Sequence, residues 1–253
     1  MLAESPPSVR HDVAPAPLPA QRRARRWIAL LEVIAVSGFP TQILLGLLLA
    51  LAGMPAFQSD GRLSLAYLVT LWLVDTVLML TLVFWLLRVR RESPRALFLG
   101  ARPLLLETLL GVAMVPVAFG VVGVVLLTAQ RIAPWLHNVT QNPFEQLITS
   151  RSDAMIVGAV AVISGGLREE LQRAFILHRF ERHLGGTAVG LVIFSVVFGA
   201  GHAIQGWDVA ITTMVLGAFW GGIYLWRRSV IGAVCSHSGF NLVEVFRYTL
   251  FGS

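Results

Sequence analysis

The chain has 253 residues, of which 56% are hydrophobic and 13% are charged. Soluble domains carry about 25% charged residues, so this composition excludes an ordinary soluble protein and indicates a chain that folds mostly in lipid. The formal net charge is +6, and every basic residue is Arg. Because these Arg residues cluster at the ends of apolar segments, we interpret them as signals of membrane orientation and expect no nucleic-acid partner.

Residues 1–26 combine Pro and Ala with an Arg cluster and contain too few apolar residues to form a core. We therefore predict a disordered, basic tail on the cytoplasmic side. The apolar segment that follows is too long for a signal peptide and is expected to remain as a membrane anchor.

Apolar stretches long enough to cross a bilayer recur between Trp27 and Phe251. They predict an all-α bundle of transmembrane helices with about seven spans. The chain then divides into N-terminal helices at 27–128, a loop at 129–152 and a membrane core of four spans at 153–250. The expected spans are residues 28–53, 64–87, 103–128, 153–184, 187–204, 209–226 and 230–250.

Most Arg residues fall in the segments on one side of these spans, at residues 1–27, 88–102, 179–186 and 226–228. By the positive-inside rule the N-terminus is cytoplasmic, and seven spans place the C-terminus outside. The loop at 129–152 contains Trp135 and Phe144, which favour a position in the membrane interface. A half-span in this loop is an alternative that gives eight spans and reverses the side of the C-terminus.

Ionisable residues within spans are functional candidates, because a charge at the bilayer centre costs roughly 2.5–3.5 kcal/mol on insertion scales. Asp75 stands alone in its span, where a structural hydrogen bond is the favoured interpretation. Glu32, Glu107, Glu244 and Arg247 lie nearer the ends of spans and are expected to reach the interface.

The fourth span differs from the others because Arg168, Glu169, Glu170 and Arg173 occur within six residues. Arg173 lies within about one helical turn of both carboxylates, so it can neutralise one and leave the other available for chemistry. A buried ion pair that only fixes helix packing is the alternative, and this span alone does not decide between them.

Two histidines on later spans join this cluster. His202 ends the segment Phe198-Gly199-Ala200-Gly201-His202, and His237 opens His237-Ser238-Gly239-Phe240-Asn241. At about 1.5 Å rise per residue, these side chains lie deep enough to share a cavity with Glu169. His237 and Asn241 share one helix face, and burial of either is costly without a polar partner.

A carboxylate beside an imidazole can activate water as a general base. A second imidazole with an Asn amide can stabilise the oxyanion that develops on a peptide carbonyl. The set therefore fits amide hydrolysis without a Ser or Cys nucleophile. Because two His and one Glu are also a common zinc set, Glu169, His202 and His237 are the expected ligands if a metal is present.

These three segments resemble the CAAX protease and bacteriocin-processing (CPBP, or Abi) family of intramembrane proteases, which includes the type II CAAX prenyl endopeptidases. The family motifs are E-E-x-x-x-R, F-x-x-x-H and H-x-x-x-N, and the second and third match here in full, at Phe198 and His237. In the first motif the family Arg would fall at Ala174, one position after Arg173. Arg173 keeps a helical spacing of three from Glu170 and is expected to take over as its charge partner.

The resemblance implies a glutamate-dependent endopeptidase without a catalytic metal or other cofactor, although the family is often named as metalloproteases. Glu169 would be the general base with His202, while His237 and Asn241 would form the oxyanion site. Glu170 would belong to the same catalytic set, with Arg173 and Phe198 in support. The implied partners are the lipid bilayer and a protein or peptide substrate, such as a C-terminus or a pro-peptide, in a bacterial cytoplasmic membrane.

Two other functions stay open. A catalytically silent bacteriocin-immunity or scaffold protein of the same fold is supported by the shifted Arg173. A small transporter could use a buried Glu to carry protons, but the sequence shows no inverted repeat or paired broken helices.

Overall fold

The computed structural model describes residues 19–251, which are almost entirely helical. Apart from an isolated bridge between Phe57 and Leu63, these residues form no β-structure. The predicted all-α fold is therefore confirmed. The α-helices are α1 (Pro19–Val36), α2 (Phe39–Leu51), α3 (Leu65–Val89), α4 (Pro94–Phe98), α5 (Leu104–Ile132), α6 (Arg151–Val160), α7 (Glu169–His183), α8 (Thr187–Ala200), α9 (Trp207–Arg227) and α10 (Ile231–Phe251).

The remaining helical segments are short or irregular. A π-helical segment, η3 (Ala161–Arg168), joins α6 to α7 without a break. Single 3-10 turns form η1 (Pro134–Leu136), η2 (Glu145–Leu147) and η4 (Ala203–Gln205).

Helices lie at each predicted span, but fewer of them have the length and hydropathy of a spanning helix. Three meet both requirements, namely α3, α5 and α9, and the pair α1 and α2 makes a fourth if its 40° bend is counted as one span. Helix α8 is apolar but has only 14 residues, and α7 carries many charged residues. The apolar helices support an integral membrane protein, while the count of about seven spans stays a prediction.

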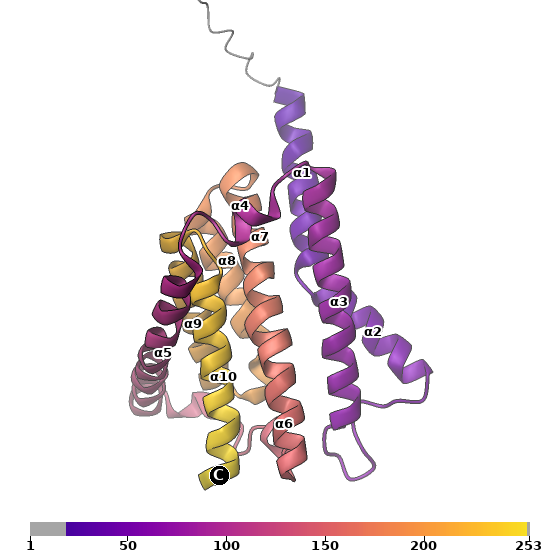
Figure 1. The fold of residues 1–253 in the computed structure, drawn as a ribbon. Coiled ribbons are helices and arrows are strands. Elements are labelled where there is room, and N and C mark those ends of the chain that lie inside the picture. The colour runs from indigo at the N-terminus through magenta and orange to yellow at the C-terminus, as the bar shows by residue number, and fades with distance from the viewer. Residues whose placement is uncertain (1–18, 252–253) are drawn as a thin grey trace, which may run out of the picture.

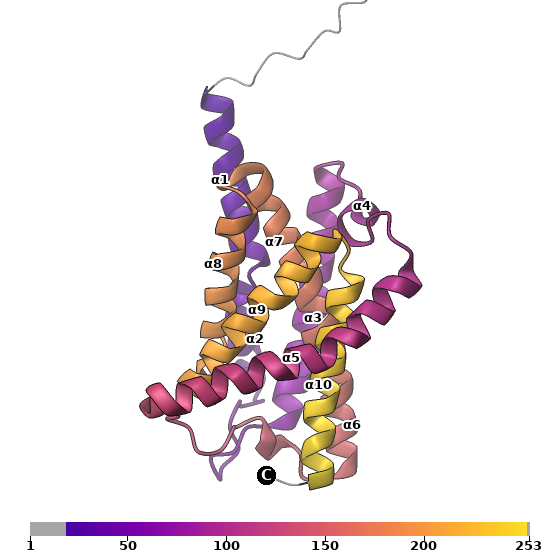
Figure 2. The ribbon, with the colours of Figure 1, turned by 90° about the vertical axis from the view of Figure 1, so that its left-hand side faces the viewer.

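Figures 1 and 2 show that most of the long helices run between two ends of the molecule, while α5 crosses it obliquely (Figure 2). One end carries the start of α1, the end of α3 with α4, and the turns after α7 and α9. We call it the Arg-rich end, because most Arg-containing segments identified in the sequence lie there. The loops before α3 and before α6 lie at the opposite end, where α10 also terminates (Figures 1 and 2).

Two boundary predictions are corrected by these helices. Residues 19–26 form the first turns of α1 instead of a disordered tail, because the Ala, Gln and Arg of this segment favour helix and continue into an apolar one. Residues 1–18 of the predicted tail lie outside the described residues. Residues 133–150 contain only η1 and η2, so the half-span considered for this loop is not formed.

Helix α7 is the centre of the fold. Its residues from Leu171 to Leu177, with Phe180, are buried, and its apolar side chains join the main core with Met79, Val83 and Phe194. Because this part of α7 is surrounded by protein, its buried Arg side chains are neutralised by carboxylates of the protein and not by lipid headgroups or water.

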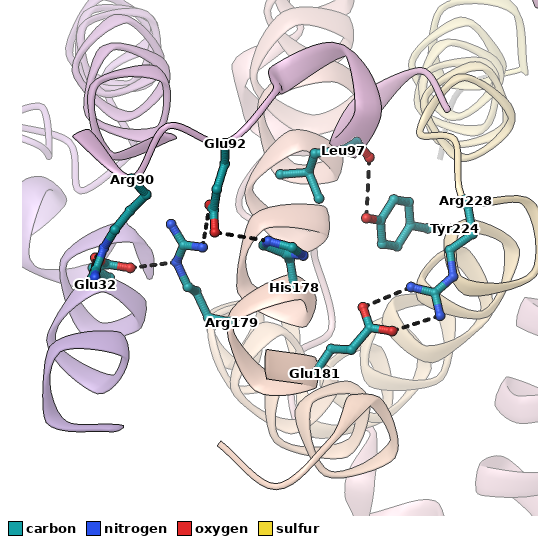
Figure 3. Close-up of polar contacts among 9 residues, drawn as sticks. All are labelled: Glu32, Arg90, Glu92, Leu97, His178, Arg179, Glu181, Tyr224 and Arg228. Carbon is teal, nitrogen blue, oxygen red and sulfur yellow. Dashed lines mark hydrogen bonds and ion pairs between the residues drawn. The ribbon is translucent and has the colours of Figure 1, made fainter. Parts of the chain in front are cut away.

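Figure 3 shows such a network at the Arg-rich end. Glu32 accepts from Arg90 at 2.7 Å and lies 2.5 Å from Nε of the buried Arg179, which also contacts Glu92 at 2.6 Å. Burial alone raises the pKa of Glu92, but the hydrogen bond and positive charge of Arg179 outweigh it and lower this pKa below its usual value. The network ties α1, α3 and α7 together.

The expectation that Glu32 and Glu107 reach the interface was wrong. Glu32 is buried in the network of Figure 3, and Glu107 is fully buried and accepts from Arg227 at 2.6 Å. Each lies within reach of an Arg from another helix, so pairing inside the protein replaces exposure to the headgroups.

Helices α5 and α10 approach closely at Gly111. A Cβ added there would lie 2.5 Å from Cβ of Cys235 and 2.6 Å from the carbonyl oxygen of Gly232. A Cβ added at Gly120, on the same helix, would meet no neighbouring group within 4 Å. Gly111 therefore fixes the distance between α5 and the helix that carries His237.

We expect Gly111→Ala to lower the free energy of unfolding by about 1–3 kcal/mol, because the added methyl overpacks a backbone contact. The matched variant Gly120→Ala should be neutral or stabilising by up to about 1 kcal/mol through helix propensity. Thermal unfolding of both variants in detergent would compare them. Equal stability of the two would contradict the close approach of α5 and α10.

Candidate active site

The helix changes form directly before the paired carboxylates. The π-helical η3 has eight residues and ends at Arg168, so α7 begins at Glu169. Segments of π-helix are rare and occur frequently at functional sites. Gly165 and Gly166 lie within η3, and a Cβ on Gly166 would overlap Ser238 of α10. The sequence predicted one regular helix here, and the adjacent glycines are the only signal in the sequence that could have indicated the change.

Glu170 is held by two partners from different positions in the sequence. Arg173, one turn along α7, forms an ion pair with it, and Nδ1 of His237 on α10 lies 2.8 Å from the same carboxylate oxygen. All three residues are buried. Since a carboxylate paired with a guanidinium only accepts hydrogen bonds, Nδ1 of His237 is the donor, and Nε2 carries the lone pair when the ring is neutral.

Arg173 is also enclosed by aromatic rings. Its guanidinium carbon lies 4.9 Å from the ring centroid of Phe194 and 5.0 Å from that of Phe198. Cations over aromatic faces are attracted electrostatically. The ion pair expected from the spacing of three is therefore formed, although Arg173 stands one position earlier than in the family motif.

Arg168, the other Arg of this segment, forms an ion pair with Asp75. Asp75 is 1% exposed, forms an ion pair with Arg168, and accepts from Thr41 at 2.5 Å and from Gln42 at 3.1 Å. The structural hydrogen bond favoured for Asp75 is therefore formed, and because α3 packs beside η3, Asp75 also meets Arg168 of the fourth predicted span. Gly38, at the break between α1 and α2, makes room for Arg168, since a Cβ there would lie 2.6 Å from its guanidinium nitrogen.

Glu169 is the carboxylate of this segment that takes part in neither of these ion pairs. It is half-buried, and within residues 19–251 it forms no hydrogen bond or ion pair. Its neighbours on both sides are engaged elsewhere, Arg168 with Asp75 and Glu170 with Arg173. Glu169 is thus free to interact with a water molecule or a ligand.

His202 follows the last turn of α8. Its Nδ1 lies 2.9 Å from the carbonyl oxygen of Phe198, and because a carbonyl only accepts, Nδ1 carries the proton. Nε2 of the neutral ring therefore has a free lone pair. The ring of Phe198 contacts both imidazoles, with centroids 5.0 Å from His202 and 6.4 Å from His237. In the described part of the chain, no hydrogen bond joins His202 to Glu169.

Asn241 lies one turn after His237 and reaches the π segment. Its amide donates to the carbonyl oxygen of Ala161 at 3.2 Å, which leaves its second N–H available. A Cβ on Gly165 would lie 2.6 Å from this amide nitrogen and 4.0 Å from Nε2 of His237. The missing side chain at Gly165 therefore leaves space that both groups face.

Trp220 of α9 was not identified from the sequence. Its ring stacks on that of His237, with centroids 3.7 Å apart and an interplanar angle of 13°, and its indole N–H donates to Ser236 at 3.2 Å. It holds the imidazole plane while Glu170 holds one edge. A Trp in an apolar span gives no sign of this role, since aromatic residues are common in such segments.

No group of three or more His, Cys, Asp or Glu side chains is arranged to hold a metal ion within residues 19–251. Glu169, His202 and His237 therefore do not form a ready ligand set in this structure. The expectations about metal and cofactors stay predictions.

The fold and this cluster define a helical membrane protein with a buried Glu, Arg and His site that joins three helices. Residues 151–243, which contain all three motifs, match the family model of Rce1-like type II CAAX prenyl endopeptidases. This match covers the part of the chain that carries the motifs, and it confirms the resemblance seen in them. No curated protein and no solved structure matches the chain.

We expect Asp75→Asn to destabilise the protein by about 3–5 kcal/mol, because it leaves the buried Arg168 without its counter-charge. Asp60→Asn is the matched control, since Asp60 pairs with Arg62 on the surface, and it should leave stability unchanged. Thermal unfolding in detergent measures both. A double variant, Asp75→Leu with Arg168→Met, should recover stability, and failure to do so would contradict a mainly electrostatic cause.

Proposed function

We propose that this protein is a CAAX-type intramembrane endopeptidase in which Glu169 acts as the general base. The proposal rests on the different surroundings of two adjacent carboxylates. Glu170 is neutralised by Arg173 and bonded to His237, whereas Glu169 is half-buried without a partner among the described residues. The match of residues 151–243 to the Rce1-like family model supports a protease of this kind.

In the proposed reaction, Glu169 takes a proton from a water molecule while the water oxygen attacks the scissile carbonyl carbon. The new C–O bond forms as the carbonyl electrons move onto its oxygen. The second O–H of the water donates a hydrogen bond to the lone pair on Nε2 of His202. This hydrogen bond orients the water for the attack. When the C–N bond breaks, the proton held by Glu169 passes to the leaving amine.

His237 and Asn241 would stabilise the oxyanion from the space beside Gly165. The free N–H of Asn241 is a donor in any state, whereas His237 donates through Nε2 only when both ring nitrogens carry protons. Glu170, 2.8 Å from Nδ1, is the counter-charge for that form. Loss of one such donor typically lowers kcat by about 100- to 1,000-fold.

The substrate proposed is a protein C-terminus or pro-peptide that enters from the bilayer, and the reaction needs no cofactor. By the positive-inside rule, the Arg-rich end faces the cytoplasm. A bacterial cytoplasmic membrane is the proposed location. Zinc held by Glu169, His202 and His237 is the alternative mechanism.

A catalytically silent immunity or scaffold protein of the same fold is the second candidate. Two observations favour it: Arg173 departs from the family spacing, and no hydrogen bond joins Glu169 to His202 within the described residues. In that case the charged cluster would only fix helix packing or bind a partner.

We expect Glu169→Gln to reduce cleavage by at least about 100-fold, because the amide cannot accept the water proton. His202→Ala should also reduce it, while Glu181→Gln, an exposed position on the same helix, should retain full activity. The assay is peptide release from a membrane-embedded library of protein C-termini and pro-peptides, with thermal unfolding as the folding control. Activity retained in Glu169→Gln would exclude this base, and a folded wild type without activity would favour the silent protein.

We expect cleavage to persist after exhaustive treatment with metal chelators, since the proposed water is activated by a carboxylate and an imidazole. The measurement is activity and bound-metal content of the same chelated sample. Loss of activity that is restored by adding zinc would show the metal-dependent alternative.

A further inference from the structure

The Arg-rich end carries a cleft that the proposed reaction does not use. It has a volume of about 800 Å³ and lies between the first turns of α1 and the turn after α7. Helix α1 extends beyond the neighbouring helices at this end (Figure 1), and the side chains of its residues 22–27 are exposed. The lining includes Arg22, Arg23, Arg26, Trp27, Leu30 and Leu184.

The lining residues of α1 are arranged by charge along the helix. Arg22, Arg26 and Leu30 repeat at a spacing of four, and Arg23, Trp27 and Leu30 repeat at four and three, so both rows lie on neighbouring tracks of one face. After Pro19, which begins the helix, the guanidinium groups belong to the outer turns, and Trp27 and Leu30 belong to the inner ones. The cleft is therefore cationic at its outer part and apolar toward the bundle.

Two Arg side chains of this cleft, Arg23 and Arg26, are not compensated in the way that other charges at this end are. Arg90 and Arg179 pair with Glu32, and Arg228 pairs with Glu181 (Figure 3). Arg23 and Arg26, in contrast, form no ion pair within residues 19–251, and no carboxylate lines the described cleft.

We infer that this cleft binds an anionic phospholipid, with its phosphate on Arg23 and Arg26 and an acyl chain along Trp27, Leu30 and Leu184. Guanidinium groups bind phosphate oxygens in bidentate fashion, and Trp is enriched where membrane meets water. The order of charge along α1 matches that of a lipid, whose phosphate lies outside its hydrocarbon. This lipid site is separate from peptide cleavage and does not depend on it.

The test uses the full chain with phosphatidylglycerol and phosphatidylcholine, and counts retained lipids by native mass spectrometry. The variant Arg22→Gln, Arg23→Gln, Arg26→Gln should bind phosphatidylglycerol roughly 10- to 100-fold more weakly, given the attraction that each basic residue contributes. The control is Arg88→Gln, Arg91→Gln, Arg95→Gln, which removes the same charge from exposed positions around the end of α3 and α4. It should bind within about twofold of wild type, because the proposed site lies elsewhere.

A second measurement reports the apolar part of the cleft. Brominated phosphatidylglycerol should quench more fluorescence in wild type than in Trp27→Phe, and inorganic phosphate alone should not reverse this quenching. Equal loss of binding in both triple variants would overturn the site in favour of a diffuse surface charge. Equal binding of the two lipids, or displacement by inorganic phosphate, would also overturn it.

Discussion

The ion pair between Arg173 and Glu170 organises the centre of this protein. Both side chains are buried in α7, where an unpaired charge would cost several kcal/mol, about 3–5 when one partner of a buried pair is lost. Glu170 also accepts from His237, and Arg173 contacts the rings of Phe194 and Phe198. Through one pair, α7 therefore fixes side chains of α8 and α10.

The same principle explains why Glu169 is distinct. Four charged residues lie between positions 168 and 173, and three of them form ion pairs. Arg168 pairs with Asp75, and Arg173 pairs with Glu170. Glu169 is left without a counter-charge of its own in the described structure, at the point where a π-helical segment meets an α-helix. Glu169 is thus available as the proposed base because its charged neighbours are already paired with other residues.

The two ends of α1 show how charge is treated differently at depth and at the surface. Deep in the bundle, Glu32 is enclosed by Arg90 and Arg179 (Figure 3). At the outer turns, Arg23 and Arg26 face a cleft without such partners in the described residues. Charge that the protein neutralises itself stabilises the fold, whereas charge left open at the membrane interface is available to lipid.

Sequence alone determined the helical class, the position of each long helix and the three motifs, because these depend on composition and on local spacing. It also determined the pairing of Glu170 with Arg173, since residues three apart meet in any α-helix. The tertiary structure alone decided that Asp75 meets Arg168, that Glu32 and Glu107 are buried, and that Trp220 stacks on His237. Those contacts join different helices, so they depend on which faces pack together, and a residue's own neighbours in the chain do not specify that.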